Sequence, residues 1–374
     1  MTKIAPEPSL RLAAWLGGLA AVALAGFATH ARAADAAPPA STAKPYHPPR
    51  TAYGAPDLQG VWTNTALTFL ARPPIFKNLI ATDAEEKTML KFFMSMTGDL
   101  LKPTVDPKEG APPVVKEAPQ SDILEMDLHL ARINGQPRSS WIVEPANGQI
   151  PFTAAGQKAY SGKKSTYNDP EARPLTERCL IAVGSPEGPP MMNTGFNGNY
   201  GIVQTRDFVT IQVEMNHDVR IVRMVDRAHA PSEVTRWMGD SIGWWDGDTL
   251  VVESTNFDPR GVVDSLNGGF RHGPKTRVIE RFTRTAKDQM LYEFTVEDAD
   301  YYKQPWSGQM PMRATKGPIY EYACHEGNYS LPNALSGARY AEAHPEPPAP
   351  ATPAAATSAP KTGGVLHDHH PGGE

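Results

Sequence analysis

The segment Ser241–Phe257, SIGWWDGDTLVVESTNF, restricts the fold of this chain more than any other stretch. Two tryptophans, Trp244 and Trp245, precede Asp246-Gly247-Asp248, and a β-branched run, 249–255, follows. An Asp-Gly pair between two such runs is the strongest short-range signal for a β-hairpin, because the tight turn needs residues that tolerate positive φ. The segment therefore predicts a β-hairpin inside a longer run of strands.

Further strands surround this hairpin. The run Phe208–Met215 alternates apolar and polar residues, as a strand with one buried face does. Short turns separate the other runs, and helical periodicity is nearly absent after residue 199. The other predicted strands are 57–64, 139–145, 200–205, 219–225, 277–284, 289–297, 310–315 and 319–324. The pattern predicts a mainly β fold, an antiparallel meander that closes into a barrel.

The residues between the first strand and the later meander, about 65–198, form an insertion with helical signals. Thr82 or Asp83 can cap a helix there, and a second short helix is expected at 153–161. The first helix carries an apolar stripe of Met89, Leu90, Phe92, Phe93 and Met96. Such a stripe usually packs against a core, although a lid over an apolar cavity has the same pattern.

The N-terminus predicts export. An apolar run, Leu12–Phe27, follows a weakly basic start, and Ala31-Arg32-Ala33 offers small residues to a signal peptidase. The run is marginal as a membrane anchor, and no membrane span is expected after cleavage. The chain then divides into a signal peptide (1–33), a Pro/Ala-rich linker (34–56), one β-rich domain (57–340) and a Pro/Ala/His-rich tail (341–374). We therefore expect a periplasmic or secreted protein.

Cysteine content and net charge restrict the classes of function and the kinds of site that the chain can have. The two cysteines, Cys179 and Cys324, are expected to form a disulfide in an oxidising compartment. The formal net charge of −5, without a basic cluster, argues against nucleic-acid binding. The histidines of the tail have no packed scaffold to fix a coordination geometry, so no metal site is predicted. No motif for a cofactor is present either.

No standard catalytic motif occurs, so candidate residues come from the polar faces and ends of the predicted strands. A general acid/base reaction in the barrel cavity would use Glu214, His217 and His325, with Arg281 opposite a developing negative charge. The expected ligand contacts are Trp244, Trp245, Glu253, Asn256 and Tyr322. For any one of these residues, a place on the solvated outer surface of the sheet is the simpler explanation.

Two resemblances add to this. Gly60-x-Trp62 in the first strand resembles the Gly-x-Trp of lipocalin-like (calycin) barrels, which implies a barrel with a ligand cavity. DLQGVWTN at 57–64, WWDGDTLVVE at 244–253 and YEYACHEGNY at 320–329 together resemble a large family of uncharacterised secreted proteins of Gram-negative bacteria. The second resemblance implies that the protein is exported, and it implies no catalytic mechanism.

Three hypotheses follow. The first is a periplasmic or secreted β-barrel that binds a small apolar or aromatic molecule. The second is a cofactor-free lyase, isomerase or hydrolase that works by general acid/base catalysis in the same cavity. The third is a structural or partner-binding envelope protein, which a sealed core and an exposed apolar patch would favour.

Overall fold

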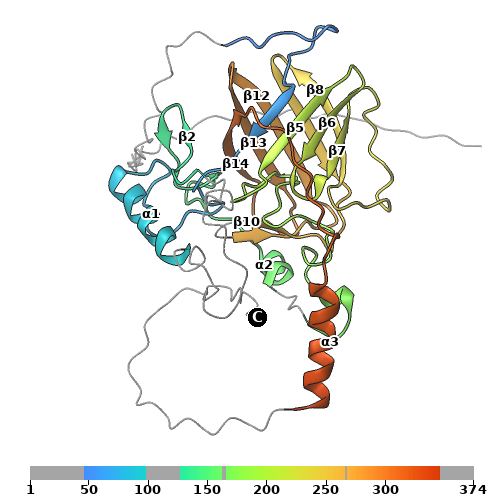
Figure 1. Ribbon diagram of the computed structural model, residues 1–374. Helices are drawn as coiled ribbons and strands as arrows, with labels where there is room; N and C mark the ends of the chain where they lie inside the picture. The colour runs from blue at the N-terminus through green and yellow to red at the C-terminus, as the bar shows by residue number, and fades with distance from the viewer. Residues whose placement is uncertain (1–45, 98–126, 162–165, 266–267, 346–374) are drawn as a thin grey trace, which may run out of the picture. The chain divides into compact units, whose positions relative to one another are not determined.

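The computed structural model describes residues 46–97, 127–161, 166–265 and 268–345, and a closed nine-stranded β-barrel dominates them (Figure 1). Around the barrel the strands are ordered β1 (Gly60–Thr63), β5 (Asn199–Gln204), β6 (Phe208–Val213), β7 (Val219–Arg223), β8 (Asp240–Asp246), β9 (Thr249–Thr255), β12 (Arg277–Ala286), β13 (Gln289–Glu297) and β14 (Trp306–Ala314). β1 pairs with both β5 and β14, which closes the sheet. The mainly β barrel is confirmed, and the lipocalin-like relationship stays a prediction.

The hairpin predicted at residues 241–257 is present as β8 and β9. Asp246 pairs with Thr249 across the turn, and Gly247 has φ 61°, a conformation that glycine adopts without steric cost. Because side chains alternate along a strand, the two tryptophans separate. Trp245 packs against the barrel core, whereas Trp244 lies on the outer side, with the Arg227 guanidinium 6.0 Å from its ring centre.

β7 and β8 are joined by a short parallel pairing. The register pairs only Val222 with Ser241 and Arg223 with Ile242, whereas the other neighbouring barrel strands run antiparallel. The connection between them, residues 224–239, carries the chain back along the outside of the barrel, as a parallel pair requires. The expectation of an antiparallel meander throughout is therefore wrong at this one junction.

Large side chains fill the barrel interior. Every second residue of each strand points inward, and the largest of these side chains are at most 1% exposed. They are Trp62, Tyr200, Phe282, Met290, Tyr292, Phe294, Trp306, Met310 and Met312. Trp62, the tryptophan of Gly60-x-Trp62, also donates its indole N–H to the Leu58 carbonyl at 2.9 Å.

Short elements outside the barrel connect β1 to β5. At the start of α1, Thr82 Oγ1 accepts from Glu85 N at 3.3 Å and Thr82 N donates to Glu85 Oε2 at 2.7 Å, a capping box. Met89 and Phe93 of the apolar stripe are buried, whereas Phe92 is 48% exposed. The elements are α1 (Asp83–Thr97), β2 (Arg132–Ile133), β3 (Gln136–Pro137), β4 (Ile142–Glu144), α2 (Ala154–Ser161) and η3 (Pro170–Ala172). Both predicted helices are confirmed.

The strand predicted at 319–324 is wrong. Near its end β14 already has partners on both sides, because Arg313 pairs with Gln289 of β13 and with Thr63 of β1. Barrel closure therefore leaves no free edge for a further strand there. The remaining elements are η4 (Met215–His217), β10 (Val263–Ser265), β11 (Gly268–Phe270) and α3 (Ser330–Ala343).

The expected disulfide between Cys179 and Cys324 is present, with 5.8 Å between the two Cα atoms. Asn328 donates to the Glu177 carbonyl at 3.1 Å beside it, which ties the start of α3 to the η3 region. Within the described residues, no helix has both the length and the apolar character that crossing a membrane requires. The predicted signal peptide and the histidines of the tail lie outside the described residues.

Replacing both cysteines by serine is expected to lower the free energy of unfolding by about 2–4 kcal/mol, because the crosslink closes a long loop in the unfolded chain. Urea denaturation of the oxidised protein, the reduced protein and the double serine variant measures the effect. The reduced protein and the variant should agree with each other. Equal stability of all three would contradict the prediction.

Candidate functional site

The barrel interior has no free space for a ligand along its inward-facing side chains. A cavity that admits a water-sized probe leaves exposed surface on the side chains that line it, and the interior side chains show almost none. The centre is also charged: Arg220 and Glu280 form two hydrogen bonds of 2.6 and 3.0 Å at 3% and 0% exposure. Tyr292 donates to the same carboxylate at 2.8 Å. A functional surface in this conformation therefore lies on the outside.

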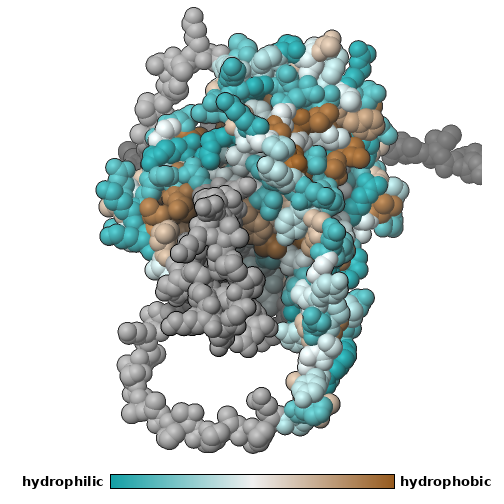
Figure 2. All heavy atoms as spheres, viewed as in Figure 1, coloured by the Kyte–Doolittle hydropathy of each residue, from teal (hydrophilic) through white to brown (hydrophobic). Residues whose placement is uncertain are grey.

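Exposed apolar side chains gather on the outer surface of β5, β6 and β7. Figure 2 shows brown side chains gathered over these three strands. Four large side chains form what we call the apolar face, with exposed fractions from 43% to 58%: Val203, Phe208, Val219 and Ile221. Exposed apolar residues are ordinary when scattered, but a contiguous group on one side of a sheet marks a contact surface.

Strand register makes the apolar face continuous. Val203 pairs with Thr210 and Thr210 pairs with Ile221, so these three side chains form one row across three strands. In the next row Gln212 pairs with Val219. Their strand neighbours, such as Ile202 and Val222, point inward and are buried. The face is thus pleated and free of charge at its centre.

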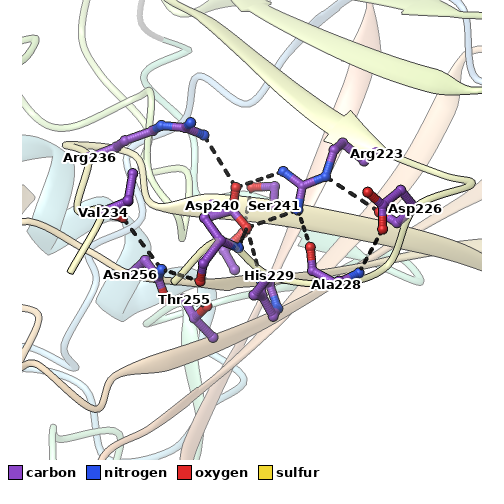
Figure 3. Close-up of polar contacts among 12 residues, drawn as sticks. Arg223, Asp226, Ala228, His229, Val234, Arg236, Asp240, Ser241, Thr255 and Asn256 are labelled. Carbon is purple, nitrogen blue, oxygen red and sulfur yellow. Dashed lines mark hydrogen bonds and ion pairs between the residues drawn. The ribbon is translucent and has the colours of Figure 1, made fainter. Parts of the chain in front are cut away.

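A polar network holds the β7–β8 connection beside this face (Figure 3). Asp240, at the start of β8, is 1% exposed and accepts two hydrogen bonds from Arg223 at 2.7 and 3.0 Å. Arg236 donates at 3.2 Å and the backbone N–H of Ala230 at 3.0 Å. The hydrogen bonds from Arg223 hold the pKa of Asp240 well below its usual range, so the carboxylate stays ionised.

His229 extends the network along the barrel wall. Its Nδ1 lies 3.0 Å from Asp240 Oδ2, and its Nε2 lies 3.1 Å from Glu253 Oε1. Glu253 also accepts from Arg277, which pairs with Glu297 at 2.9 Å. With both ring nitrogens engaged, His229 has no free nitrogen to take a proton from a substrate.

Asn256 completes the attachment of the same connection. It has φ 57°, and its side-chain amide donates to the carbonyls of Ala230 and Pro231, both at 2.9 Å. The network therefore works as a clamp: Asp240 and Asn256 fix both halves of the 224–239 connection against the outer wall.

The structure does not bring the four predicted catalytic residues together. Glu214 is fully buried, where it accepts from Asn199 Nδ2 at 2.7 Å and from the backbone N–H of Tyr320 at 2.9 Å. Arg281 lies on the outer wall in an ion pair with Asp246 at 2.8 Å. His217 and His325 are both exposed. Their catalytic role stays a prediction, and their placement does not support it.

The predicted ligand contacts also separate. Trp244 and Trp245 lie on opposite sides of β8, and Glu253 and Asn256 belong to the clamp. Tyr322 lines an open depression of ≈ 640 Å³ beside the disulfide. Other side chains of this depression are mostly polar: Thr176, Glu177, Asn197, Glu321, Glu326, Asn328 and Tyr329.

The polar side chains buried inside the barrel were not predicted from the sequence. Neither was the inward course of the loop that contacts them. Glu187 is 4% exposed, and burial raises its pKa to about 8. It lies in GSPEGPPMMN, which reads as a loop because of its glycines and prolines. The two adjacent methionines, Met191 and Met192, were the only signal there of a buried position.

Among the described residues, no group of three or more His, Cys, Asp and Glu side chains is placed to hold a metal ion. No protein-family model matches the chain, and neither does any curated protein sequence. The resemblance to uncharacterised secreted proteins therefore stays a prediction.

Asp240→Asn is expected to lower the free energy of unfolding at pH 7 by about 2 kcal/mol, because it weakens several charge-assisted hydrogen bonds. The pKa of Asp240 is depressed in the folded state, so its contribution is present above the unfolded-state value and is lost as pH falls below about 4. The difference between variant and wild type should thus shrink on acidification.

Urea denaturation at pH 7 and pH 3 measures both effects. Asp246→Asn is the matched control, because Asp246 is 62% exposed and makes a single surface ion pair. If both variants had the stability of the wild type at pH 7, the clamp would not be a stabilising feature.

Proposed function

We propose that the protein is an exported β-barrel that binds another protein through the apolar face of β5–β7. The observation that carries the proposal is the group of exposed apolar side chains on these strands: Val203 and Ile221 share one row with Thr210 between them, and Phe208 and Val219 lie on either side of it. Placing these side chains against a partner removes their surface from water, which is favourable at roughly 25 cal/mol per Å².

The rest of the molecule supports a scaffold role. In this conformation side chains fill the interior of the described barrel, with the Arg220–Glu280 pair at its centre. Of the candidate acid and base residues, Glu214 is buried under Tyr320 and His217 and His325 are exposed, so the placement of these residues does not form a shared cavity among the described residues. A sealed barrel with an exposed apolar patch is the combination that favours partner binding over the other two hypotheses.

The surroundings of the apolar face fit a specific contact. Arg206 and Asp207 at the β5–β6 turn and the Arg223–Asp240 pair beside β7 give the face a polar border. Protein interfaces commonly combine an apolar centre with such a polar rim. The clamp holds the border in place, so little ordering is needed when a partner binds.

Export and the compartment belong to this proposal. The disulfide is in keeping with an oxidising compartment, because such bonds persist outside the cytoplasm. A periplasmic or secreted location agrees with the signal predicted at residues 1–33.

A small-molecule ligand is the second candidate, favoured by the depression beside the disulfide. Its ≈ 640 Å³ lies within the roughly 300–1,000 Å³ of ligand pockets. Tyr322 and Tyr329 offer rings for stacking, and the lining contains three glutamates and no lysine or arginine. This composition suits a neutral or cationic polar molecule better than the apolar ligand predicted for the barrel cavity.

The first candidate predicts that a photo-crosslinking residue at Val203 forms a discrete adduct with one envelope protein in the native host. Ile221→Glu should reduce that adduct at least tenfold, because burying an unpaired carboxylate at the contact costs more than about 1.4 kcal/mol. Adduct yield on immunoblots is the measurement.

Ile80→Glu is the matched control, since Ile80 is also an exposed isoleucine but precedes α1 and lies off the barrel face. It should leave the adduct unchanged. An adduct that survives Ile221→Glu, or one that Ile80→Glu removes equally, would place the contact elsewhere.

A further inference from the structure

A loop that belongs to no strand fills one end of the barrel. Residues 181–193, which we call the plug, precede β5 and end at Asn193. Met191 and Met192 are both 0% exposed and belong to the barrel core. None of the plug residues takes part in the barrel ladder, which β1 and β14 close without them.

Two inward tyrosines hold the tip of the plug through its backbone. The Met191 N–H donates to the Tyr292 hydroxyl at 2.8 Å, and the Tyr200 hydroxyl donates to the Met192 carbonyl at 3.0 Å. One tyrosine therefore offers an acceptor and the other a donor, and the plug backbone satisfies both.

Both ends of the plug are fixed to neighbouring segments of the chain. Cys179, two residues before it, is bonded to Cys324. At the other end the Asn193 side chain accepts from Trp141 Nε1 at 2.8 Å and donates to the Ala66 carbonyl at 2.8 Å. Inside the loop, Gly184 and Gly188 have positive φ of 78° and 55°. The tip is thus a tight loop between two anchors, the arrangement of a hinged segment.

The inserted plug leaves a buried carboxyl group poorly satisfied. Glu187 Oε1 accepts from the Ala182 N–H at 3.2 Å, and no described protein group bonds to its Oε2. Burial, with a smaller contribution from the nearby Asp218, raises its pKa to about 8. On the barrel side, burial raises the pKa of the Tyr200 hydroxyl. The charges of Glu187 and Glu280 act in the same direction, and the charge of Arg220 acts in the opposite direction.

Other titratable contacts of the plug do not change charge near pH 8. His272 donates its Nε2–H to the Pro189 carbonyl at 2.8 Å, and burial lowers its pKa to about 4. It is therefore neutral throughout the alkaline range. Ionisation of Glu187 without a partner for Oε2 is the change that weakens the inserted state.

We propose that the plug is displaceable, and that the barrel space held by Met191 and Met192 is a latent binding site for a small apolar molecule. The two methionine side chains leave apolar volume at the end of the barrel. An engineered cavity of about 150 Å³ is enough for one aromatic ring. The tyrosines define the polar part of the ligand: it carries a donor for Tyr292 and an acceptor for Tyr200, as a primary amide does.

Withdrawal is linked to pH through Glu187. Its carboxyl group has a raised pKa when the plug is inserted, so insertion is fully favoured below the ordinary pKa of a glutamate, and it weakens progressively as pH rises from there through the inserted-state value of about 8. Between pH 7 and pH 9, the ratio of withdrawn to inserted plug should rise about tenfold. Glu187→Gln, which keeps the shape of the protonated side chain, should remove this dependence.

Hydrogen exchange tests the displacement directly. The protection factor of the Met191 and Met192 amides should fall about tenfold from pH 7 to pH 9 in the wild type and stay constant in Glu187→Gln. Glu321→Gln, at an exposed position, is the matched control and should behave as the wild type. Equal protection at both pH values in the wild type would show that the plug is a fixed part of the core.

Binding of benzamide tests the site, with Ile221→Glu as the background so that the apolar face does not contribute. Affinity should be about tenfold higher at pH 9 than at pH 7, and Glu187→Gln should abolish the difference. Benzene without the amide should bind more weakly at both pH values. Binding that is independent of pH and of Glu187, or no binding at pH 9, would overturn the latent site and would leave the partner contact at Ile221 untouched.

Discussion

The buried ion pair between Arg220 and Glu280 is the interaction on which the rest of the barrel depends. It connects β7 to β12, which are separated in the sheet by β8 and β9, so it crosses the interior. β7 has a short ladder to β8, and this bond ties it to the far wall instead. Two charges out of water are costly, and close bidentate geometry with a third donor from Tyr292 offsets that cost. The ion pair therefore favours one arrangement of β7 relative to β12, and this effect is larger than its net contribution to the free energy of unfolding.

Features that depend on residues close together in the sequence were predicted correctly. Asp246-Gly247 placed a hairpin correctly because the turn depends on residues that touch one another in sequence. The capping residue Thr82 predicted a helix start for the same reason. The strand at 319–324 failed because its existence depends on whether β14 has a free edge, and that depends on a partner, β1, more than 240 residues earlier in the chain.

The site was harder to predict than the fold, since its residues meet only through the register of strands and a long connection. Nothing in the sequence shows that the ring of His229 lies between the carboxylates of Asp240 and Glu253. Alternation does predict that β6 has a polar side, but not that Val203 and Ile221 flank it to form an apolar face. The plug is invisible for a related reason: glycine and proline mark a loop, and they do not indicate that the loop turns inward.

The disulfide gives the chain an unusual connectivity. Every barrel strand except β1 lies between Cys179 and Cys324, so the bond converts that part of the polypeptide into a covalent ring. A protease that cuts one exposed loop inside the ring opens it without releasing a fragment, and only a second cut frees a piece. In a compartment shared with proteases, the molecule thus keeps all its parts together after a first cleavage for as long as its surroundings stay oxidising.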